Sequence, residues 1–410
     1  MSLTSYPCRS CGAGPGQLVL DLGVQPLANR LLRPEDLAKP EPRFPLHLFV
    51  CPSCWLLQLA ELVSPAELFS EYVYFSSYSE AVVEHGRQAA DRYISELGLG
   101  AHSFVVEIAS NDGYLLRSFR AAGVPHLGIE PAANVAQVAR DQDIDTLVAF
   151  FDSDLAERLA NAGQRADLIL GNNVFAHVPT PNDFVAGLGT LLKPAGRIAL
   201  EFPYLLDFLH KTEFDTVYHE HVFYFSLTAL RPLFERHGLE IIDVERLAIH
   251  GGSLRLIAAH RGAFSVRATV SDLLAEESRR GVTTPGAYAG FAAQVAGVRD
   301  ALHRMLDGLE QRNQTLAAYG AAAKGSTLLN YCGLDHRRLA FVADRSPHKQ
   351  GRLTPGTHIP IVAAEELARR RPDYTLLLTW NLADEILSQQ QAYRSAGGKF
   401  IIPIPRPIIL

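Results

Sequence analysis

The sequence predicts an α/β protein in three parts: an N-terminal zinc-binding lobe, a central Rossmann-like domain and a second Rossmann-like domain at the C-terminal end. Two observations support this prediction. Two Cys-x-x-Cys pairs lie near the N-terminus, and segments typical of buried strands alternate with helical segments twice, from about 103 to 203 and from about 315 to 405. Such alternation is typical of a parallel sheet covered by helices on both faces.

Size and composition limit the class of protein. The chain has 410 residues, which is too long for one compact core and suits two or three domains. Apolar residues make up 48% and charged residues 20%, as in ordinary globular proteins. The formal net charge of -6 argues against non-specific binding to nucleic acid or to an anionic membrane surface. Because we find no signal-peptide pattern and no apolar stretch that could span a bilayer, we expect a cytoplasmic protein.

Four of the five cysteines form two pairs, Cys8 with Cys11 and Cys51 with Cys54. In a reducing cytosol, paired Cys-x-x-Cys turns are typical of a structural zinc site, since two such turns supply four thiolates for a tetrahedron. All four positions around the metal are then filled by protein, which leaves none for catalysis. The alternative is two unrelated thiol pairs. Cys332 lies alone and is expected to be a small buried apolar residue.

The central region begins with "FVVEIAS" at 104–110, an apolar and β-branched run typical of a buried strand. The next segment, 114–123, has the pattern of a helix closed by Gly123. The elements expected after it are strands at 126–131, 146–151, 166–178 and 197–204, and helices at 134–141 and 183–196. Ligands of such sheets bind at the carboxyl ends of the strands.

The C-terminal region repeats this alternation without repeating the sequence. It follows a helix at 229–238, strand-like runs at 239–252 and 253–260, and a helical stretch at 268–314. Its expected strands are 315–320, 339–346, 373–381 and 399–405, and its expected helices are 321–333, 363–371 and 383–398. We therefore expect a zinc lobe at 1–70, a cofactor-binding domain with a catalytic insertion at 71–265, and a linker with the second Rossmann-like domain at 266–410.

The stretch "VEIASNDG" lies where the first central strand meets its helix. The common class I methyltransferase pattern at this place is an acid followed by glycines at alternate positions. Glu107 supplies the acid and Gly113 the last glycine, while Ala109 and Asn111 replace the two earlier glycines. Small residues let the backbone approach a ligand, and Asn tolerates left-handed angles. Neither sheet carries a GxGxxG motif, which argues against NAD.

Polar residues also follow the next three strands. Glu130 can accept both ribose hydroxyls of an adenosine, and Asp152 can accept from the adenine amino group. Asn172, Asn173 and His177 lie at the tip of the fourth strand. Each acid taken alone is equally well explained as a helix N-cap. The ordered set on successive strand ends favours S-adenosylmethionine as the cofactor.

The segment "FDTVYHEHVFYFS", 214–226, places Tyr218, His219, Glu220 and His221 in a run of aromatics. Histidine is the usual general base near neutral pH, so we interpret the segment as catalytic. A lone histidine in this setting would more simply be a hydrogen-bonded core residue. Upstream lies an aromatic cluster that either lines the same pocket or merely packs over it. Its members are Tyr72, Tyr74 and Tyr78.

Seven motifs occur in an order that resembles a known family. They are the four-cysteine pattern, "VEIASNDGYLL", "NNVFAHVP", "FDTVYHEHVFYFS", "HGGSLR", "YGAAAKGSTLLNYCG" and "RLTPGTHIP". Together they cover nearly the whole chain and resemble the zinc-containing sugar C-methyltransferases of deoxysugar and antibiotic biosynthesis, in particular the C-3′-methyltransferases of TDP-tetronitrose biosynthesis. The resemblance implies methylation of C-3′, or less readily C-5′, beside the ketone of a dTDP-linked 4-keto-6-deoxysugar.

The same resemblance implies roles for individual residues. His221 matches the base that removes the proton, and Tyr218 and Glu220 match its partners in the motif. His177 matches an active-site histidine, and Tyr72 a tyrosine on the substrate side. The four paired cysteines match the zinc ligands, the C-terminal domain is similar to one that holds the sugar nucleotide, and a monomer is expected by analogy.

Two departures from the family are visible, Ala109 in place of glycine and His219 in place of aspartate. The second is consistent with a different sugar or a different carbon. The expected reaction is removal of the acidic proton beside the ketone by neutral His221, enolate stabilisation by Tyr218 or His177, and in-line attack on the sulfonium methyl.

In the C-terminal domain, "GAAAKG" opens a helix after a strand, so its amides and Lys324 can bind a diphosphate. Tyr74, Asp344, Lys349 and His358 are further candidates for substrate binding. The alternative is a Rossmann-like unit that only packs. Two other classes remain open, an NAD-dependent sugar-nucleotide oxidoreductase and a zinc-knuckle nucleic-acid binder, and the missing GxGxxG and the acidic charge oppose them.

Overall fold

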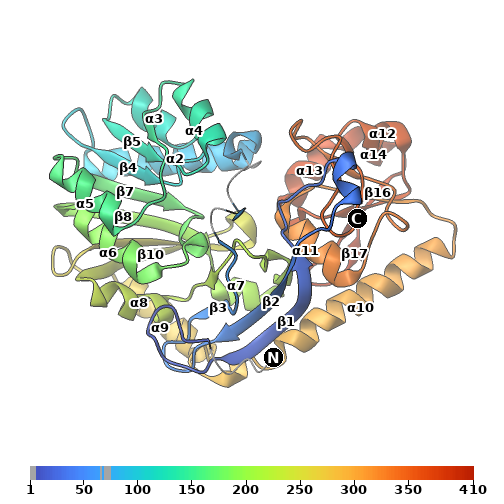
Figure 1. The fold of residues 1–410 in the computed structure, drawn as a ribbon, viewed down its shortest axis with the longest axis horizontal. Coiled ribbons are helices and arrows are strands. Elements are labelled where there is room, and N and C mark those ends of the chain that lie inside the picture. Colours follow the sequence, from blue (N-terminus) through green and yellow to red (C-terminus); the bar gives the residue numbers. More distant parts are fainter. Residues whose placement is uncertain (1–5, 65–66, 69–74) are drawn as a thin grey trace.

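The computed structural model describes residues 6–64, 67–68 and 75–410. Tyr72 and Tyr74 therefore lie outside the described residues. The chain forms three sheets, and the predicted fold class is confirmed: a cysteine-bearing N-terminal lobe, a central doubly wound domain and a C-terminal domain with a mostly parallel sheet (Figure 1). None of the described helices is long and apolar enough to cross a membrane.

The central domain is built on a seven-stranded sheet in the order β10-β11-β8-β7-β4-β5-β6. Its strands are β4 (Val105–Ile108), β5 (His126–Ile129), β6 (Thr146–Leu147), β7 (Ala166–Asn172), β8 (Leu192–Pro203), β10 (Leu239–Leu247) and β11 (Ser253–His260). The strands from β6 to β8 are parallel, whereas β11 pairs antiparallel with both β8 and β10. The strand order reverses between β4 and β7, which places a ligand crevice at the carboxyl ends of these two strands.

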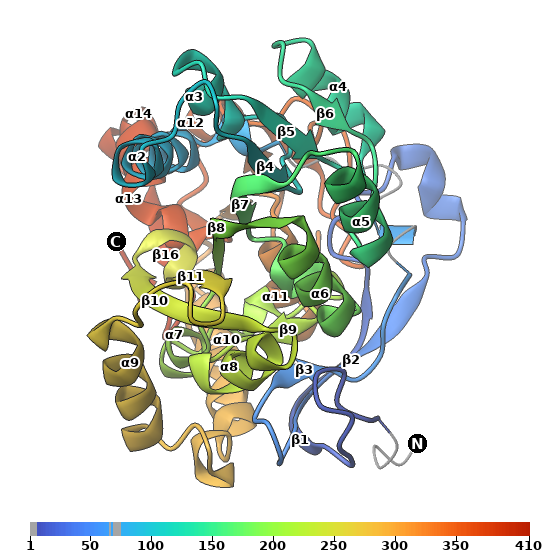
Figure 2. The ribbon, with the colours of Figure 1, turned by 90° about the vertical axis from the view of Figure 1, so that its left-hand side faces the viewer.

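Both faces of the central sheet are covered by helices (Figure 2). They are α2 (Glu80–Leu97), α3 (Leu116–Ala121), α4 (Ala133–Arg140), α5 (Ser153–Asn161), α6 (Pro181–Leu191), α7 (Leu205–His210) and α8 (Leu227–Arg236). Along β7, Leu168 and Leu170 belong to the apolar cluster with α2 and α3, while Ile169 belongs to the cluster with α5 and α6. Because successive side chains of a strand point to opposite faces, β7 is buried on both.

Several element predictions differ from the structure; the strand expected at 166–178, for example, ends at Asn172. The expected strand at 146–151 is only the two residues of β6, and α5 after it was not predicted. The helix expected to reach residue 196 ends at Leu191, because Pro194 disfavours helical angles in the residue before it and lacks an N–H. The helix expected at 383–398 is two helices, α13 (Ala383–Gln389) and α14 (Gln391–Ser395), since Gln390 leaves helical backbone angles.

The N-terminal lobe contains β1 (Gln17–Pro26), η1 (Pro34–Ala38), β2 (Arg43–Val50) and β3 (Leu57–Leu59). These strands form an antiparallel sheet whose fourth strand, β9 (Phe223–Tyr224), comes from the end of the segment predicted to be catalytic. Leu57 pairs with Tyr224 and Gln58 with Phe223. In Figure 1, β1 and β2 run beneath the gap between the other two domains. The sheet of the N-terminal lobe therefore includes the end of the segment that the sequence predicts to be catalytic.

The C-terminal domain follows α9 (Ala268–Arg279) and the long helix α10 (Phe291–Glu310). Its sheet has the order β14-β13-β12-β15-β16-β17, parallel except for β17. Its elements are β12 (Leu316–Tyr319), α11 (Ala323–Cys332), β13 (Val342–Asp344), β14 (Ile361–Ala363), α12 (Glu366–Arg370), β15 (Tyr374–Leu377), β16 (Lys399–Ile402) and β17 (Ile408–Ile409). The order reverses between β12 and β15, giving a second crevice of the same kind.

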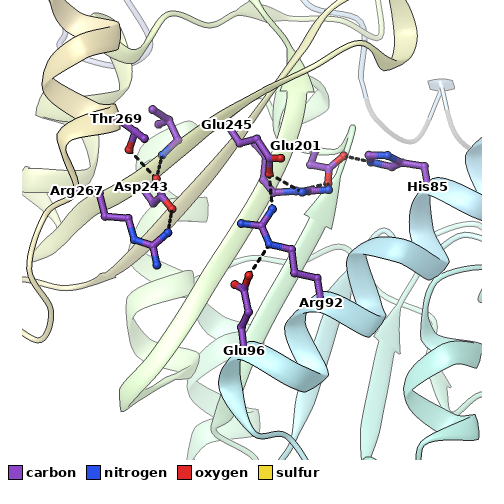
Figure 3. A network of polar contacts seen from close by, with 10 residues as sticks. His85, Arg92, Glu96, Glu201, Asp243, Glu245, Arg267 and Thr269 are labelled. Carbon is purple, nitrogen blue, oxygen red and sulfur yellow. Dashed lines mark hydrogen bonds and ion pairs between the residues drawn. The ribbon is translucent and has the colours of Figure 1, made fainter.

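A buried polar network fastens α2 to the central sheet (Figure 3). Glu201 of β8 accepts from His85 of α2 at 2.7 Å and from Arg255 of β11 at 2.8 Å. Arg255 and Arg92 share Glu245. Burial would raise the pKa of Glu201, but His85 and Arg255 hold it below its ordinary value. The network fixes the helix that begins directly after the cavity-lining residues 75–79 described below.

Candidate active site

One cavity of about 610 Å³ lies between the carboxyl ends of the central and C-terminal sheets. It brings together most of the residues predicted from the sequence. Those that line it are Ala109, Asn111, Glu130, Asp152, Asn172, Asn173, His177, Tyr218, His221, Lys324, Asp344 and Lys349. Tyr78 lines it as well. The predicted cofactor side, the predicted catalytic segment and the C-terminal domain therefore share a single space.

The loop after β4 adopts the backbone that its glycine-like pattern predicts. Ala109, Asn111 and Gly113 have φ angles of 54°, 51° and 77°, all in the left-handed region. A side chain at Gly113 would meet Ile144 at 3.1 Å, so only glycine fits there without a shift. Glu130 holds the loop, because its carboxylate accepts from Asn111 N at 3.0 Å and from Ala132 N at 2.8 Å.

Each oxygen of Glu130 keeps one further lone pair, and the side chain lines the cavity. It therefore fits the ribose hydroxyls of S-adenosylmethionine. Asp152 is the N-cap of α5 and accepts from Leu155 N at 2.7 Å, so the N-cap alternative is realised for this acid. Its second oxygen has no protein donor among the hydrogen bonds of the described residues, and Asp152 also lines the cavity. Asn172 donates to the Tyr114 hydroxyl at 3.4 Å.

Glu107 does not line this cavity. Its side chain is 0% exposed, and neither carboxyl oxygen has a hydrogen-bond partner among the described residues. Burial, with the nearby Asp112 and Glu130, raises the pKa of Glu107 well above its ordinary value. The motif acid thus lies beneath the loop, outside the cavity lining, where burial favours its neutral form.

Residues 75–79 cross the mouth of the cavity and link the two sheets. Ser76 N donates to the Asn111 side chain at 2.8 Å. Tyr78 hydrogen-bonds to His348 Nε2 at 3.1 Å, and the rings of Phe75 and His348 stack with centroids 5.0 Å apart. Of the predicted aromatic cluster, Tyr78 is therefore placed at the cavity and in contact with the C-terminal domain.

The predicted base and its tyrosine form a hydrogen-bonded pair. The Tyr218 hydroxyl lies 2.7 Å from His221 Nε2, and His221 Nδ1 lies 3.0 Å from the Thr216 carbonyl oxygen. A carbonyl oxygen only accepts, so Nδ1 carries the proton and Nε2 accepts from the phenol. His177 packs edge-on against His221 with centroids 4.8 Å apart. Burial, with His177, lowers the pKa of His221 well below its ordinary value, so the ring is neutral near pH 7.

The two residues between Tyr218 and His221 turn away from the cavity. Glu220 is 3% exposed and accepts two hydrogen bonds from Asn29 Nδ2, at 2.7 and 2.9 Å. Burial raises the pKa of Glu220 to about 7. His219 Nε2 lies 3.2 Å from the Pro45 carbonyl oxygen on the N-terminal lobe. Glu220 and His219 therefore join the segment to the lobe, whereas Tyr218 and His221 face the cavity.

The C-terminal side of the cavity mirrors the cofactor side. Asp344 ends β13 and accepts from Ala321 N at 2.7 Å and Ser346 N at 2.8 Å, much as Glu130 holds its own loop. Lys349 donates to the Ala321 carbonyl oxygen at 2.8 Å. His358 is not among the residues that line the cavity, and its ring lies 3.4 Å from Glu41 of the N-terminal lobe.

Sequence reasoning missed several residues that line the cavity, among them His250 and Asn29. His250, in η5 (Ile249–Gly251), has a φ of 59° and is followed by Gly251 and Gly252. A histidine before two glycines in "HGGSLR" was a usable signal for a tight turn that presents a side chain. Asn29 lies far away in the sequence, in the lobe, and no local pattern marks it.

The four paired cysteines converge in the N-terminal lobe. Their sulfur atoms all lie within 4.8 Å of one another, with 3.5 Å from Cys8 to Cys54 and 3.6 Å from Cys11 to Cys51. Thiolates at about 2.3 Å from a tetrahedral zinc ion would be separated by similar distances. The set therefore fits zinc with four protein ligands, while Cys332 is buried elsewhere.

Comparison with known proteins matches three successive regions of the chain. Three family models match, described as "Putative zinc binding domain" at residues 8–69, "Methyltransferase domain" at 82–244 and "C-methyltransferase C-terminal domain" at 248–405. The chain is 40% identical over 404 residues to C-methyltransferase NovU of Streptomyces niveus, covering 98% of this chain and 96% of NovU.

More distant similarities cover less than half of the chain. An uncharacterized methyltransferase of Mycobacterium leprae (strain TN) is 25% identical over 151 residues, 35% of this chain and 56% of that protein. Magnesium protoporphyrin IX methyltransferase from Synechocystis PCC 6803, solved with bound S-adenosylmethionine, is 16% identical with a TM-score of 0.33. That comparison covers 46% of this chain and 85% of that one.

The doubly wound central sheet, its strand-end loop and the four-cysteine lobe define an S-adenosylmethionine-dependent methyltransferase with a zinc-binding domain. The chain belongs to the family of C-methyltransferases that includes NovU.

Proposed function

We propose that this C-methyltransferase methylates the carbon beside the ketone of a nucleotide-linked 4-keto-6-deoxysugar, with dTDP as the nucleotide and C-3′ as the preferred carbon over C-5′. The observation that carries the proposal is the neutral pair of His221 and Tyr218 in a cavity that two nucleotide-type sheets share. A carbon acid beside a ketone needs a neutral base and a hydrogen-bond donor in a site that excludes water.

The two residues divide the work between them. When a ketone oxygen binds next to Tyr218, the phenol O–H donates to that oxygen instead of to His221 Nε2. The lone pair of Nε2 is then free to accept the proton that leaves the carbon. His221 Nδ1 stays bound to the Thr216 carbonyl, which orients the ring and stabilises the imidazolium that forms. S-adenosylmethionine, when bound, supplies the electrophilic methyl group. In-line transfer requires the sugar carbon and the sulfonium methyl to lie about 3 Å apart, and the shared cavity would hold both molecules.

The test is a mass-spectrometric assay of the purified protein with S-adenosylmethionine and a panel of nucleotide-linked 4-keto-6-deoxysugars, with and without a 3-hydroxyl. We expect one added methyl group on a TDP-linked member, and fragmentation or NMR will identify the carbon. If no sugar in the panel gains a methyl group while S-adenosylmethionine binds, the sugar substrate is wrong and the C-methyltransferase assignment stands.

Replacing Tyr218 with phenylalanine is expected to lower kcat about 10²-fold, because the developing oxyanion loses one donor. Affinity for S-adenosylmethionine should not change, since the phenol bonds to His221 rather than to the strand-end loop. Steady-state kinetics and calorimetry of the variant measure the two effects. Tyr224→Phe is the matched control. The Tyr224 hydroxyl donates at 3.0 Å to the Thr216 carbonyl oxygen that also contacts His221 Nδ1, but Tyr224 does not line the cavity. Unchanged kcat in Tyr218→Phe would remove the phenol from the mechanism.

A further inference from the structure

Helix α11 of the C-terminal domain is docked directly on the segment that carries the base. Thr327 Oγ1 donates to the Val217 carbonyl oxygen at 2.9 Å, and the ring of Tyr331 packs on Phe214 with centroids 5.3 Å apart. Lys324 lies three residues before Thr327 and seven before Tyr331, which is the spacing of one helix face. The fold therefore directs Lys324 toward the catalytic segment, and its side chain lines the cavity.

The surroundings of Lys324 hold its ammonium in place. Its Nζ lies 4.9 Å from the centre of the Trp380 ring, and the indole Nε1 donates to Asp215 Oδ2 at 2.7 Å. Asp215 is 0% and Glu213 1% exposed, and each has one carboxyl oxygen without a hydrogen-bond partner among the described residues. Burial raises the pKa of both acids, that of Glu213 to about 7, and the positive charge of Lys324 offsets part of this rise.

The charge of Lys324 also reaches the base. It contributes, after burial, to the lowered pKa values of His221 and His250, both of which line the cavity. Among the described residues the ammonium of Lys324 donates no hydrogen bond. A cation that lines the same cavity as the base, with its donors uncommitted, suits a negative charge that develops during the reaction.

We propose that Lys324 is a catalytic residue that stabilises the enolate oxygen at C-4′, rather than a ligand of the substrate diphosphate. This inference rests on the proposed sugar substrate. In the step concerned, the C–H bond beside the ketone breaks and its proton passes to His221 Nε2. The electron pair forms the C=C bond of the enolate, and the carbonyl oxygen takes the negative charge beside the ammonium, which keeps its protons.

The position of other charges supports this assignment over diphosphate binding. Where ionised, Glu213 and Asp215 offset part of the positive charge of Lys324, so a diphosphate with several negative charges gains less there than an enolate oxygen with one. Arg345 and Lys349, which follow β13 and also line the cavity, stand on the side of the C-terminal crevice. We assign these two cations to the phosphate oxygens; each also pairs with an acid, Arg345 with Glu385 at 3.6 Å and Lys349 with Asp344 at 3.9 Å. Lys324, which forms no ion pair among the described residues, is left for the reacting end of the sugar.

The test separates enolisation from binding. Wild type and Lys324→Met are incubated with the 4-keto sugar nucleotide in D₂O without methyl donor, and loss of the C–H signal is followed by NMR at saturating substrate. We expect exchange to slow about 10²-fold in Lys324→Met. Calorimetry should give a Kd for TDP within about threefold of wild type, because methionine keeps the shape of the side chain and only the charge is removed.

Two controls complete the experiment. Lys349→Met should weaken TDP binding. Lys399→Met, the same substitution on β16 outside the cavity, should leave both exchange and TDP affinity unchanged, and S-adenosylmethionine affinity reports whether each variant is folded. If Lys324→Met loses TDP affinity but exchanges at the wild-type rate when saturated, Lys324 is a phosphate ligand and the inference is overturned. Equal exchange and equal affinity would overturn it as well. A wild-type enzyme that neither exchanges nor methylates any 4-keto sugar would instead refute the proposed function itself.

Discussion

Replacing His221 with glutamine is expected to lower methyl transfer by about 10²–10⁴-fold, the usual contribution of a general base. Glutamine can still occupy the position of the imidazole in the cavity wall and hydrogen-bond to the Tyr218 hydroxyl, but it cannot take a proton from carbon. Affinity for S-adenosylmethionine should stay near the wild-type value, because the strand-end loop is held by Glu130 and not by His221. Single-turnover kinetics and calorimetry measure the two quantities separately.

His219→Gln is a matched control, since the same substitution is made two residues away. His219 bonds to the Pro45 carbonyl and packs on Phe44, so its loss should affect the contact with the N-terminal lobe and spare the chemistry. If His221→Gln loses cofactor affinity and methyl transfer to the same degree, His221 is a structural residue and the base must be sought elsewhere in the cavity.

The pH dependence follows from the environment of His221. Burial and the neighbouring His177 lower its pKa, so the ring stays neutral, and therefore basic, at pH values where an ordinary histidine is half protonated. We expect kcat/KM to stay constant from pH 8 down through about 6.5, the usual pKa of histidine, and to fall only below it. A half-maximal point at pH 6.5 or above would contradict this. Stability should be followed in parallel, because Glu213 and Glu220, both with a pKa of about 7, titrate nearby.

The cofactor half of the site could be predicted from sequence because parallel strands bring their carboxyl ends to one edge. Asn111, Glu130 and Asp152 follow strands, Asn172 is the last residue of β7, and all four line the cavity. The same rule failed for Glu107, which lies inside β4 and whose side chain is buried beneath the loop.

The catalytic half was less predictable, because it depends on turns and on long-range packing. The sequence grouped Tyr218, His219, Glu220 and His221, and only the turn geometry decides that the first and last face the cavity. His358 was expected to bind substrate, but its loop is paired with the N-terminal lobe through the Leu32–Leu353 bridge, and its ring faces Glu41. The strand–helix pattern around "GAAAKG" pointed to Lys324. The Trp380 ring beside its ammonium, and Asp215, which accepts from that ring, come from distant segments.

Loss of zinc is expected to abolish methyl transfer as well as to unfold the N-terminal lobe. Cys51 and Cys54 directly precede β3, which pairs with β9 at the end of the catalytic segment, and Leu59 N donates to the Val222 carbonyl at 2.8 Å. A structural zinc ion contributes on the order of 10 kcal/mol to the fold of a small domain. Without it, β3 and the Asn29 contact to Glu220 lose their support, and so does the turn that presents Tyr218 and His221.

Cys54→Ser tests this coupling, with Cys332→Ser as the matched control because Cys332 is equally buried but lies outside the four-cysteine cluster. Elemental analysis should show about one zinc per chain in the control and little in Cys54→Ser, with a lower unfolding temperature and at least a tenfold loss of methyl transfer in the latter. S-adenosylmethionine affinity should change less, since Glu130 and its loop belong to the central sheet. A zinc-free Cys54→Ser variant with wild-type turnover would show that the lobe only packs against the enzyme, and that β9 holds the catalytic turn without it.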